Sequence, residues 1–298
     1  MNIAYAHAAG DPAHVVTWTS LFTAWSFDPA FLVPLVLAIL YFRGWWGYRL
    51  WKNRRLRRWR PVAFVSGLVV IALALLSPID RLADHSFTWH MAQHDLLMLL
   101  GIPLLLLGAP FVPVVRGLPR AFRRRAFIPF AKQRGVRAFL AFVTRPPIAL
   151  AFFETSIVLW HFPAFYDAAL FHAGIHYLEH FCFVFAGIAF WWHIVTPYPF
   201  PSRLHHLLRV LMLVASAIIN TALSAMVSFA DHALYGYTLM EGFWGLTMLE
   251  DQTIGAGLMW VLGGMMRLGA ILIILAIYAR QEEAKEPRNL PKLAAHKA

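Results

Sequence analysis

Residues 89–98 read Trp-His-Met-Ala-Gln-His-Asp-Leu-Leu-Met and open a long apolar run that extends over residues 89–112. Within this stretch, His90, His94 and Met98 recur every four residues, so in a helix they share one face. An apolar run of roughly 20 residues is long enough to cross a hydrocarbon core of about 30 Å. The stretch therefore predicts a membrane helix that carries potential metal ligands near one end.

The composition of the whole chain indicates an integral membrane protein. Of its 298 residues, 60% are hydrophobic and 14% are charged, whereas soluble domains carry about 25% charged residues. We expect an all-α, polytopic membrane helix bundle with seven transmembrane helices. The predicted helices cover residues 29–48, 61–79, 89–112, 146–163, 174–195, 207–230 and 253–279.

The basic residues predict the orientation of this bundle. The segments after the first, third and fifth predicted helices and the C-terminal tail are rich in Lys and Arg, whereas the other loops share only Arg81. By the positive-inside rule, the N-terminus lies outside and the C-terminus in the cytoplasm of a bacterial inner membrane protein. We therefore expect a non-cytoplasmic arm (1–26), a seven-helix domain (27–280) with a basic cytoplasmic loop (113–145), and a polar cytoplasmic tail (281–298).

The net charge of +11 is explained by the same topology. Basic residues between membrane helices contact anionic lipid headgroups, so we expect membrane lipids as partners and no binding of nucleic acid. The loop 113–145 mixes Arg with Phe, a pattern typical of an amphipathic segment on the membrane surface.

Histidines gather at the predicted outer ends of the helices. A second stripe of four-residue spacing contains His172, His176 and His180, provided that its helix begins early enough. His161 ends the fourth predicted helix. Imidazole is a ligand for zinc, copper and iron, and thioethers such as that of Met98 favour Cu(I). The pattern predicts a metal site, with neighbouring carboxylates, Glu179 among them, available to orient the rings.

Short motifs spread along the chain carry a family resemblance. They are Phe27-Asp28-Pro29, Trp59-Arg60-Pro61, Leu76-Ser77-Pro78-Ile79-Asp80, His90-Met91-Ala92-Gln93-His94, Gly108-Ala109-Pro110, and Asp251-Gln252 with Gly255 through Trp260. Together they resemble the integral-membrane CtaG family of cytochrome c oxidase assembly factors. The resemblance implies a role in maturing a haem–copper oxidase by handling copper on the outer side of the membrane. It also implies an oxidase subunit as the partner, and it leaves a homo-oligomer open.

The resemblance places His90, His94 and Asp251 in the family motif, while the other candidates depend on spacing and position. The predicted metal-site residues are His90, His94, His176, His180, His172, Met98, Asp251 and His161.

Two other classes of function compete with copper handling. A membrane haem protein would use one histidine from each of two facing helices, and a transporter would line a path for copper or protons. An enzyme is not expected, because the sequence shows no nucleophile–base pair and no phosphate-binding loop.

Two charged residues lie deep within predicted helices, Glu154 in the fourth and Arg267 in the seventh. Charges inside a membrane are costly and usually paired. We expect these residues to form a buried ion pair that joins the two helices, with a proton or ion path as the alternative.

Overall fold

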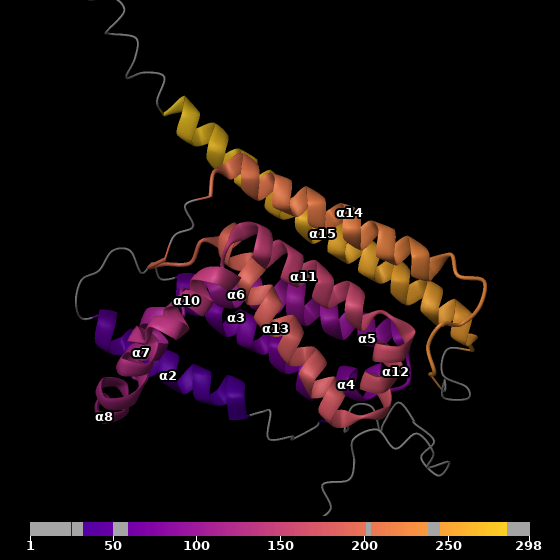
Figure 1. The fold of residues 1–298 in the computed structure, drawn as a ribbon, viewed down its shortest axis with the longest axis horizontal. Helices are drawn as coiled ribbons and strands as arrows, with labels where there is room; N and C mark the ends of the chain where they lie inside the picture. Colours follow the sequence, from indigo (N-terminus) through magenta and orange to yellow (C-terminus); the bar gives the residue numbers. More distant parts are fainter. Residues whose placement is uncertain (1–24, 26–31, 50–58, 201–203, 238–244, 285–298) are drawn as a thin grey trace, which may run out of the picture.

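The computed structural model describes Trp25 and residues 32–49, 59–200, 204–237 and 245–284. Within these ranges every regular element is a helix, so the predicted all-α class is confirmed (Figure 1). The predicted arm (1–26) lies outside the described residues except for Trp25, and so does most of the predicted tail (281–298).

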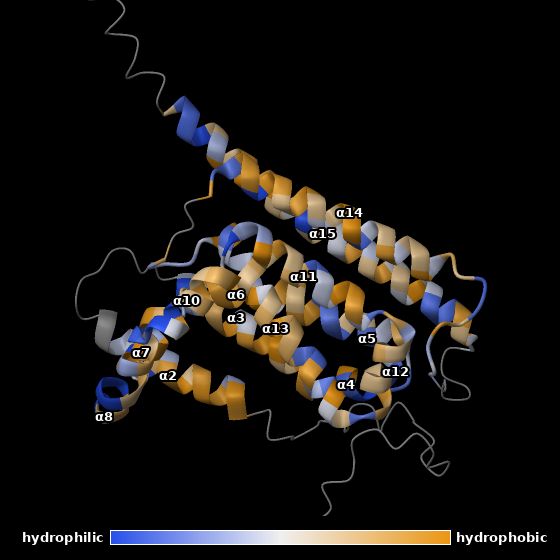
Figure 2. Ribbon diagram, in the orientation of Figure 1, coloured by the Kyte–Doolittle hydropathy of each residue, from blue (hydrophilic) through white to orange (hydrophobic). Residues whose placement is uncertain are grey.

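Five helical segments are long and apolar enough to cross a membrane. They are α3 (Trp59–Leu76), the continuous segment Phe87–Leu107, α13 (Ala173–Val195), α14 (His206–Ser228) and α15 (Met248–Glu283). Figure 2 shows that most of their length is apolar. They match five of the seven predicted transmembrane helices.

The first and fourth predicted helices do not reach this length and composition on their own. α11 (Pro146–Trp160) qualifies only together with α10 (Arg134–Val143), which is bent by 72° from it. The bend follows from Pro146, because a residue before proline avoids the helical conformation, and Arg145 accordingly has ψ 132°. The apolar part of α2 (Leu32–Arg49) is shorter than that of the other candidates.

The remaining helices are short. They are α4 (Pro78–Ala83), α7 (Phe111–Gly117), α8 (Arg120–Phe122), the π-helix η3 (Arg123–Phe127), α9 (Ile128–Lys132) and α12 (Pro163–Phe171). The basic loop 113–145 is thus largely helical, and in α10 the side chains of Phe139, Leu140 and Phe142 are exposed.

The segment Phe87–Leu107 consists of α5 (Phe87–Asp95), the π-helix η2 (Leu96–Gly101) and α6 (Ile102–Leu107). Pro103 lacks the N–H that an α-helix would direct at the fourth residue before it. The turn widens at this point, and the N–H of Ile102 bonds to the carbonyl of Leu97, five residues earlier. Single π-turns of this kind occur often at functional sites.

Two long helices, α14 and α15, lie side by side along one side of the molecule (Figure 1). α15 also packs against α5, while α13 packs against α11, α12 and α6. The core between them is built from large apolar side chains, including the stacked rings of Phe153 and Phe190 with centroids 4.5 Å apart. This packing holds α5 and α13 in place as neighbours.

Candidate metal centre

The start of α5 is fixed by α15. The Asp251 carboxylate of α15 accepts hydrogen bonds from the Phe87 N–H at 2.7 Å and from the Ser86 hydroxyl at 2.8 Å. A carboxylate at this position satisfies N–H groups that have no partner within the helix and complements the helix dipole. Asp251, predicted to belong to the metal site, therefore anchors the helix that carries His90 and His94 and is not one of the convergent ligand groups.

The rotation of α5 about its own axis is fixed by Gln93, which is fully buried. Its amide donates to the Asp80 carboxylate at 2.7 Å and to the Ala74 carbonyl at 2.9 Å, both on the side of α3 and α4. Since Gln93 is held on that side, His90 and His94 are directed towards α13. The polar residue between the two histidines thus determines which way they face.

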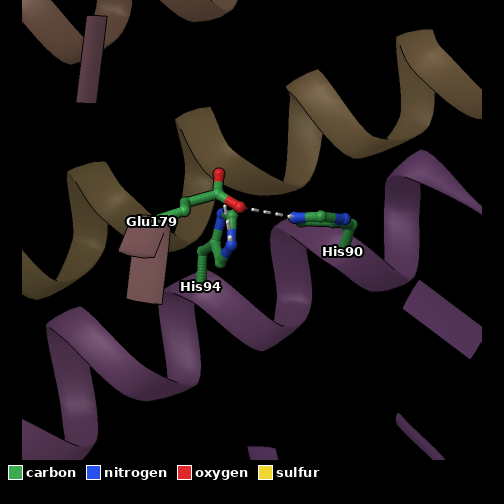
Figure 3. Close-up of side chains that lie close together, drawn as sticks. All are labelled: His90, His94 and Glu179. Carbon is green, nitrogen blue, oxygen red and sulfur yellow. Dashed lines mark ion pairs between the residues drawn. The ribbon is translucent and has the colours of Figure 1, made fainter. Parts of the chain in front are cut away.

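The histidines of α5 meet Glu179 of α13 in the interior (Figure 3). Nε2 of His90 lies 3.9 Å from one carboxylate oxygen of Glu179, and Nε2 of His94 lies 3.9 Å from the other. His176 and His180 come from the same helix as Glu179. The five residues form two groups that share Glu179, and within each group the possible ligand atoms lie within 4.8 Å of one another. We call these five residues the histidine–glutamate cluster.

The geometry of this cluster fits a metal ion better than a set of direct hydrogen bonds. A separation of 3.9 Å is too long for a hydrogen bond. Two donors each about 2.1 Å from one metal are about 3 to 4 Å apart, depending on the angle between them. Neither ring nitrogen of His94 and neither oxygen of Glu179 has a hydrogen-bond partner within the described part of the chain. Buried polar atoms without a partner are costly unless something binds them.

A second layer of residues orients His90. The Tyr237 hydroxyl lies 2.9 Å from Nδ1 of His90 and 2.6 Å from the hydroxyl of Tyr166 on α12. Burial raises the pKa of Tyr237 well above its usual range, so the phenol keeps its proton. With Nδ1 engaged by tyrosine, Nε2 of His90 is the nitrogen that faces Glu179. Partners of this kind fix the ring orientation of metal-binding histidines.

The segment that carries Tyr237 is itself tied down by α15. The backbone N–H of Leu234 donates to the Gln252 side chain at 2.7 Å, and the Gln252 amide donates to the Val227 carbonyl at 3.0 Å. The Asp251-Gln252 pair singled out in the sequence therefore has two positioning roles: its aspartate holds α5 and its glutamine holds the tyrosine segment.

Three predicted residues besides Asp251 lie outside the cluster. His172 is exposed and directly precedes α13. Its backbone angles, φ −131° and ψ 106°, are extended, so His172 does not continue the stripe of His176 and His180. The side chain of His161 binds the Ile157 carbonyl through Nδ1 at 2.8 Å, and its Nε2 faces Met91. Met98 falls within η2, where the α-helical spacing ends, and lines a neighbouring cavity with His161.

The predicted direct ion pair between Glu154 and Arg267 is not formed. Arg267 donates to the Ser216 hydroxyl at 2.8 Å and to the Gly263 carbonyl at 3.0 Å. Among the described residues, neither Glu154 oxygen lies within hydrogen-bond geometry of a partner, although Ser216 and Arg267 both act on this carboxyl group. The reason is that α14, which carries Ser216, packs against both α11 and α15. Glu154 and Asp95 still act on Arg267 electrostatically.

The anchoring role of Asp251 predicts a loss of stability. We expect Asp251→Ala to lower the free energy of unfolding by about 1–3 kcal/mol, because the Phe87 N–H and the Ser86 hydroxyl lose their partner. Asp251→Asn should be milder, since an amide oxygen still accepts. Thermal unfolding of the purified variants measures the difference; equal effects of the two substitutions would contradict the anchoring role.

The helices and the cluster together define a class of protein. Several apolar helices are long enough to cross a membrane, which indicates a helical membrane protein. The histidines and the carboxylate buried between two of these helices form a candidate transition-metal site.

The chain belongs to the cytochrome c oxidase caa3 assembly factor family, Caa3_CtaG, whose family model matches residues 39–281. This confirms the resemblance found in the sequence. The match includes both α5 and α13, and thus all five residues of the histidine–glutamate cluster.

The chain is also similar to uncharacterized mycobacterial proteins. The proteins of Mycobacterium bovis and Mycobacterium tuberculosis are 26% identical to it over 286 residues, which cover 92% of this chain and 42% of theirs. That of Mycobacterium leprae is 27% identical, with 88% of this chain and 40% of its own length covered. The chain thus spans less than half the length of these relatives. No solved structure matches it.

Proposed function

We propose that this protein binds copper in the histidine–glutamate cluster and delivers it to a haem–copper oxidase during assembly. The observation that carries the proposal is that two histidine pairs, from different helices, meet at one buried carboxylate. Three or four imidazole and carboxylate donors suit a divalent transition metal, and copper stands at the top of the stability order for such sites. Membership in an oxidase assembly family supports copper as the cargo. The role is one of binding and transfer, not catalysis.

Packing around the cluster favours an ion over haem. The rings of Tyr166 and Phe183 lie against those of His90 and His94, with centroids 5.1 and 4.7 Å apart. The cavity beside His94 has a volume of ≈ 20 Å³, whereas sites for organic cofactors measure about 300–1,000 Å³. A single ion fits between these helices without repacking, but a macrocycle does not.

Arg267 favours a binding protein over a transporter of copper. Arg267 lines the same cavity as His94 and is almost completely buried. A buried cation at this position raises the electrostatic energy of a divalent cation that moves further inward. Divalent copper bound at the cluster would therefore leave by the side on which it entered.

We further propose that this side is the outer one and that the chain crosses the inner membrane seven times. The alternation of basic loops supports both points. Topology reporters fused at Gln133 and at Asp167 should report the cytoplasm and the outside, respectively. The reverse pattern would place the cluster near the cytoplasm and contradict delivery at the outer face.

Metal analysis of the purified protein, with an absorption spectrum, tests the proposed cargo. We expect copper in the wild type. His90→Ala and His94→Ala should each lower the copper affinity by at least about 10–100-fold, since even the loss of a residue that only orients a ligand costs this much. His232→Ala is the matched control, because His232 is exposed beside Asp231 and belongs to neither group of the cluster. A Soret band, or copper binding in His90→Ala and His94→Ala equal to that of His232→Ala, would overturn the proposal.

A further inference from the structure

Next to the histidine–glutamate cluster, a histidine and a methionine meet in an arrangement that a hydrogen bond does not explain. Nδ1 of His161 lies 2.8 Å from the Ile157 carbonyl, which can only accept, so Nδ1 carries the proton. In the neutral ring Nε2 then has a lone pair and no hydrogen. This Nε2 lies 3.4 Å from the Met91 sulfur.

A thioether has no proton to donate either, so two lone-pair atoms face each other. An imidazolium could donate to the sulfur, but it would be a buried charge in an apolar interior, which is costly. A cation that accepts both lone pairs resolves the contact. With metal–nitrogen and metal–sulfur distances of about 2.0–2.1 and 2.3 Å, the two donors of one ion are about 3.5 Å apart. The observed distance is close to this value.

The two residues line a cavity together with a third soft donor. Met91, His161, His94 and Met98 all line it, and its volume is ≈ 20 Å³. A cavity of roughly 10–15 Å³ or more holds one water molecule, so this one accommodates a single ion. Met91, Met98 and His161 are buried, with exposed fractions of 2%, 4% and 5%. Two thioethers and an imidazole in a water-poor site form a soft donor set, and such a set selects Cu(I).

We propose that Met91, Met98 and His161 form a second metal site, selective for Cu(I) and adjacent to the histidine–glutamate cluster. We call these three residues the soft site. His94 belongs to the cluster and also lines this cavity, so the two sites are adjacent. Asp95 and Arg267 line the cavity as well. The identification of the ion as copper depends on the proposed copper delivery, whereas the geometry of the soft site does not depend on that proposal.

X-ray absorption at the copper edge tests this site in the full-length protein in detergent, loaded with Cu(I) under anaerobic, reducing conditions. We expect sulfur at about 2.3 Å from copper in the wild type. Met91→Leu and Met98→Leu together should remove this sulfur signal and weaken Cu(I) binding at least tenfold. These swaps conserve volume and are well tolerated in cores. Met265→Leu, at a methionine that is 65% exposed, is the control.

A third variant separates this site from the cluster. His176→Ala removes a cluster residue that does not line the cavity, so it should weaken Cu(II) binding but keep the sulfur signal with Cu(I). Wild-type protein that binds no Cu(II) but shows sulfur around Cu(I) would contradict the proposed cluster and support the soft site. Only nitrogen and oxygen around Cu(I) in the wild type, or sulfur that persists without Met91 and Met98, would overturn the soft site.

Discussion

Glu179→Gln is expected to reduce copper affinity by at least about 100-fold, the upper end of what the loss of an orienting partner costs. Glu179 is the residue shared by both groups of the histidine–glutamate cluster. Neither histidine pair therefore keeps a carboxylate partner in the variant. The amide has the same shape but no negative charge to offset that of the ion, and its NH₂ group cannot bind a metal. Isothermal titration of the purified variant with copper measures the loss.

The same substitution should not destabilise the protein before copper is added. The Glu179 side chain is fully buried and its oxygens have no hydrogen-bond partner among the described residues. Replacing a buried carboxylate by a neutral amide therefore removes a desolvation cost. Thermal unfolding without metal should show a variant at least as stable as the wild type, with Glu283→Gln, at an exposed glutamate, as control. Normal copper affinity in Glu179→Gln would contradict the cluster as the binding site.

Arg267→Ala is expected to have the largest effect on stability, about 3–5 kcal/mol, the cost of breaking a buried charge arrangement. The side chain is 1% exposed and donates to Ser216 and to Gly263. Its removal leaves a cavity and deprives Glu154 and Asp95 of the cation that acts on them. Unfolding of the purified protein in detergent measures the change, and Arg280→Ala, at the exposed end of α15, is the control.

A double substitution shows whether Glu154 is part of that arrangement. If it is, Glu154→Gln should be mild alone and should recover part of the stability lost in Arg267→Met, because no uncompensated carboxylate then remains. Coupled residues give non-additive effects of 0.5–3 kcal/mol. Simple additivity of the two substitutions would contradict the coupling between Glu154 and Arg267 and leave Glu154 without a structural role.

The sequence predicted the long helices well, because hydrophobic length alone determines them. The predicted helix 174–195 corresponds to Ala173–Val195, and 207–230 to His206–Ser228. The last helix begins earlier than predicted, at Met248, because Thr247 and Glu250 form a capping box that a hydrophobicity criterion does not detect. The predicted helix 146–163 begins at the same residue as α11, Pro146, because proline suits the first turn of a helix.

The arrangement of the histidines was predicted in part. The four-residue spacing within each helix correctly paired His90 with His94 and His176 with His180, because that spacing is local. The role of Glu179 as the meeting point depends on how α13 faces α5, a tertiary fact that no spacing encodes. Its position three residues after His176 was the available signal, since such residues share a helix face. His172 was included in the stripe on the condition that its helix begins early enough; it is the N-cap of α13, so it lies just outside the helix.

The sharing of Glu179 between two histidine pairs has a kinetic consequence for an ion bound as proposed. When an incoming ligand displaces one histidine pair, the ion keeps its bonds to the carboxylate and to the other histidine pair. The coordination number of the ion then changes in steps, and the bare ion is never released. Ligand exchange through such overlapping shells is associative, and its barrier is set by the rearrangement of side chains. A protein that holds copper tightly can in this way still give it up quickly to the right acceptor.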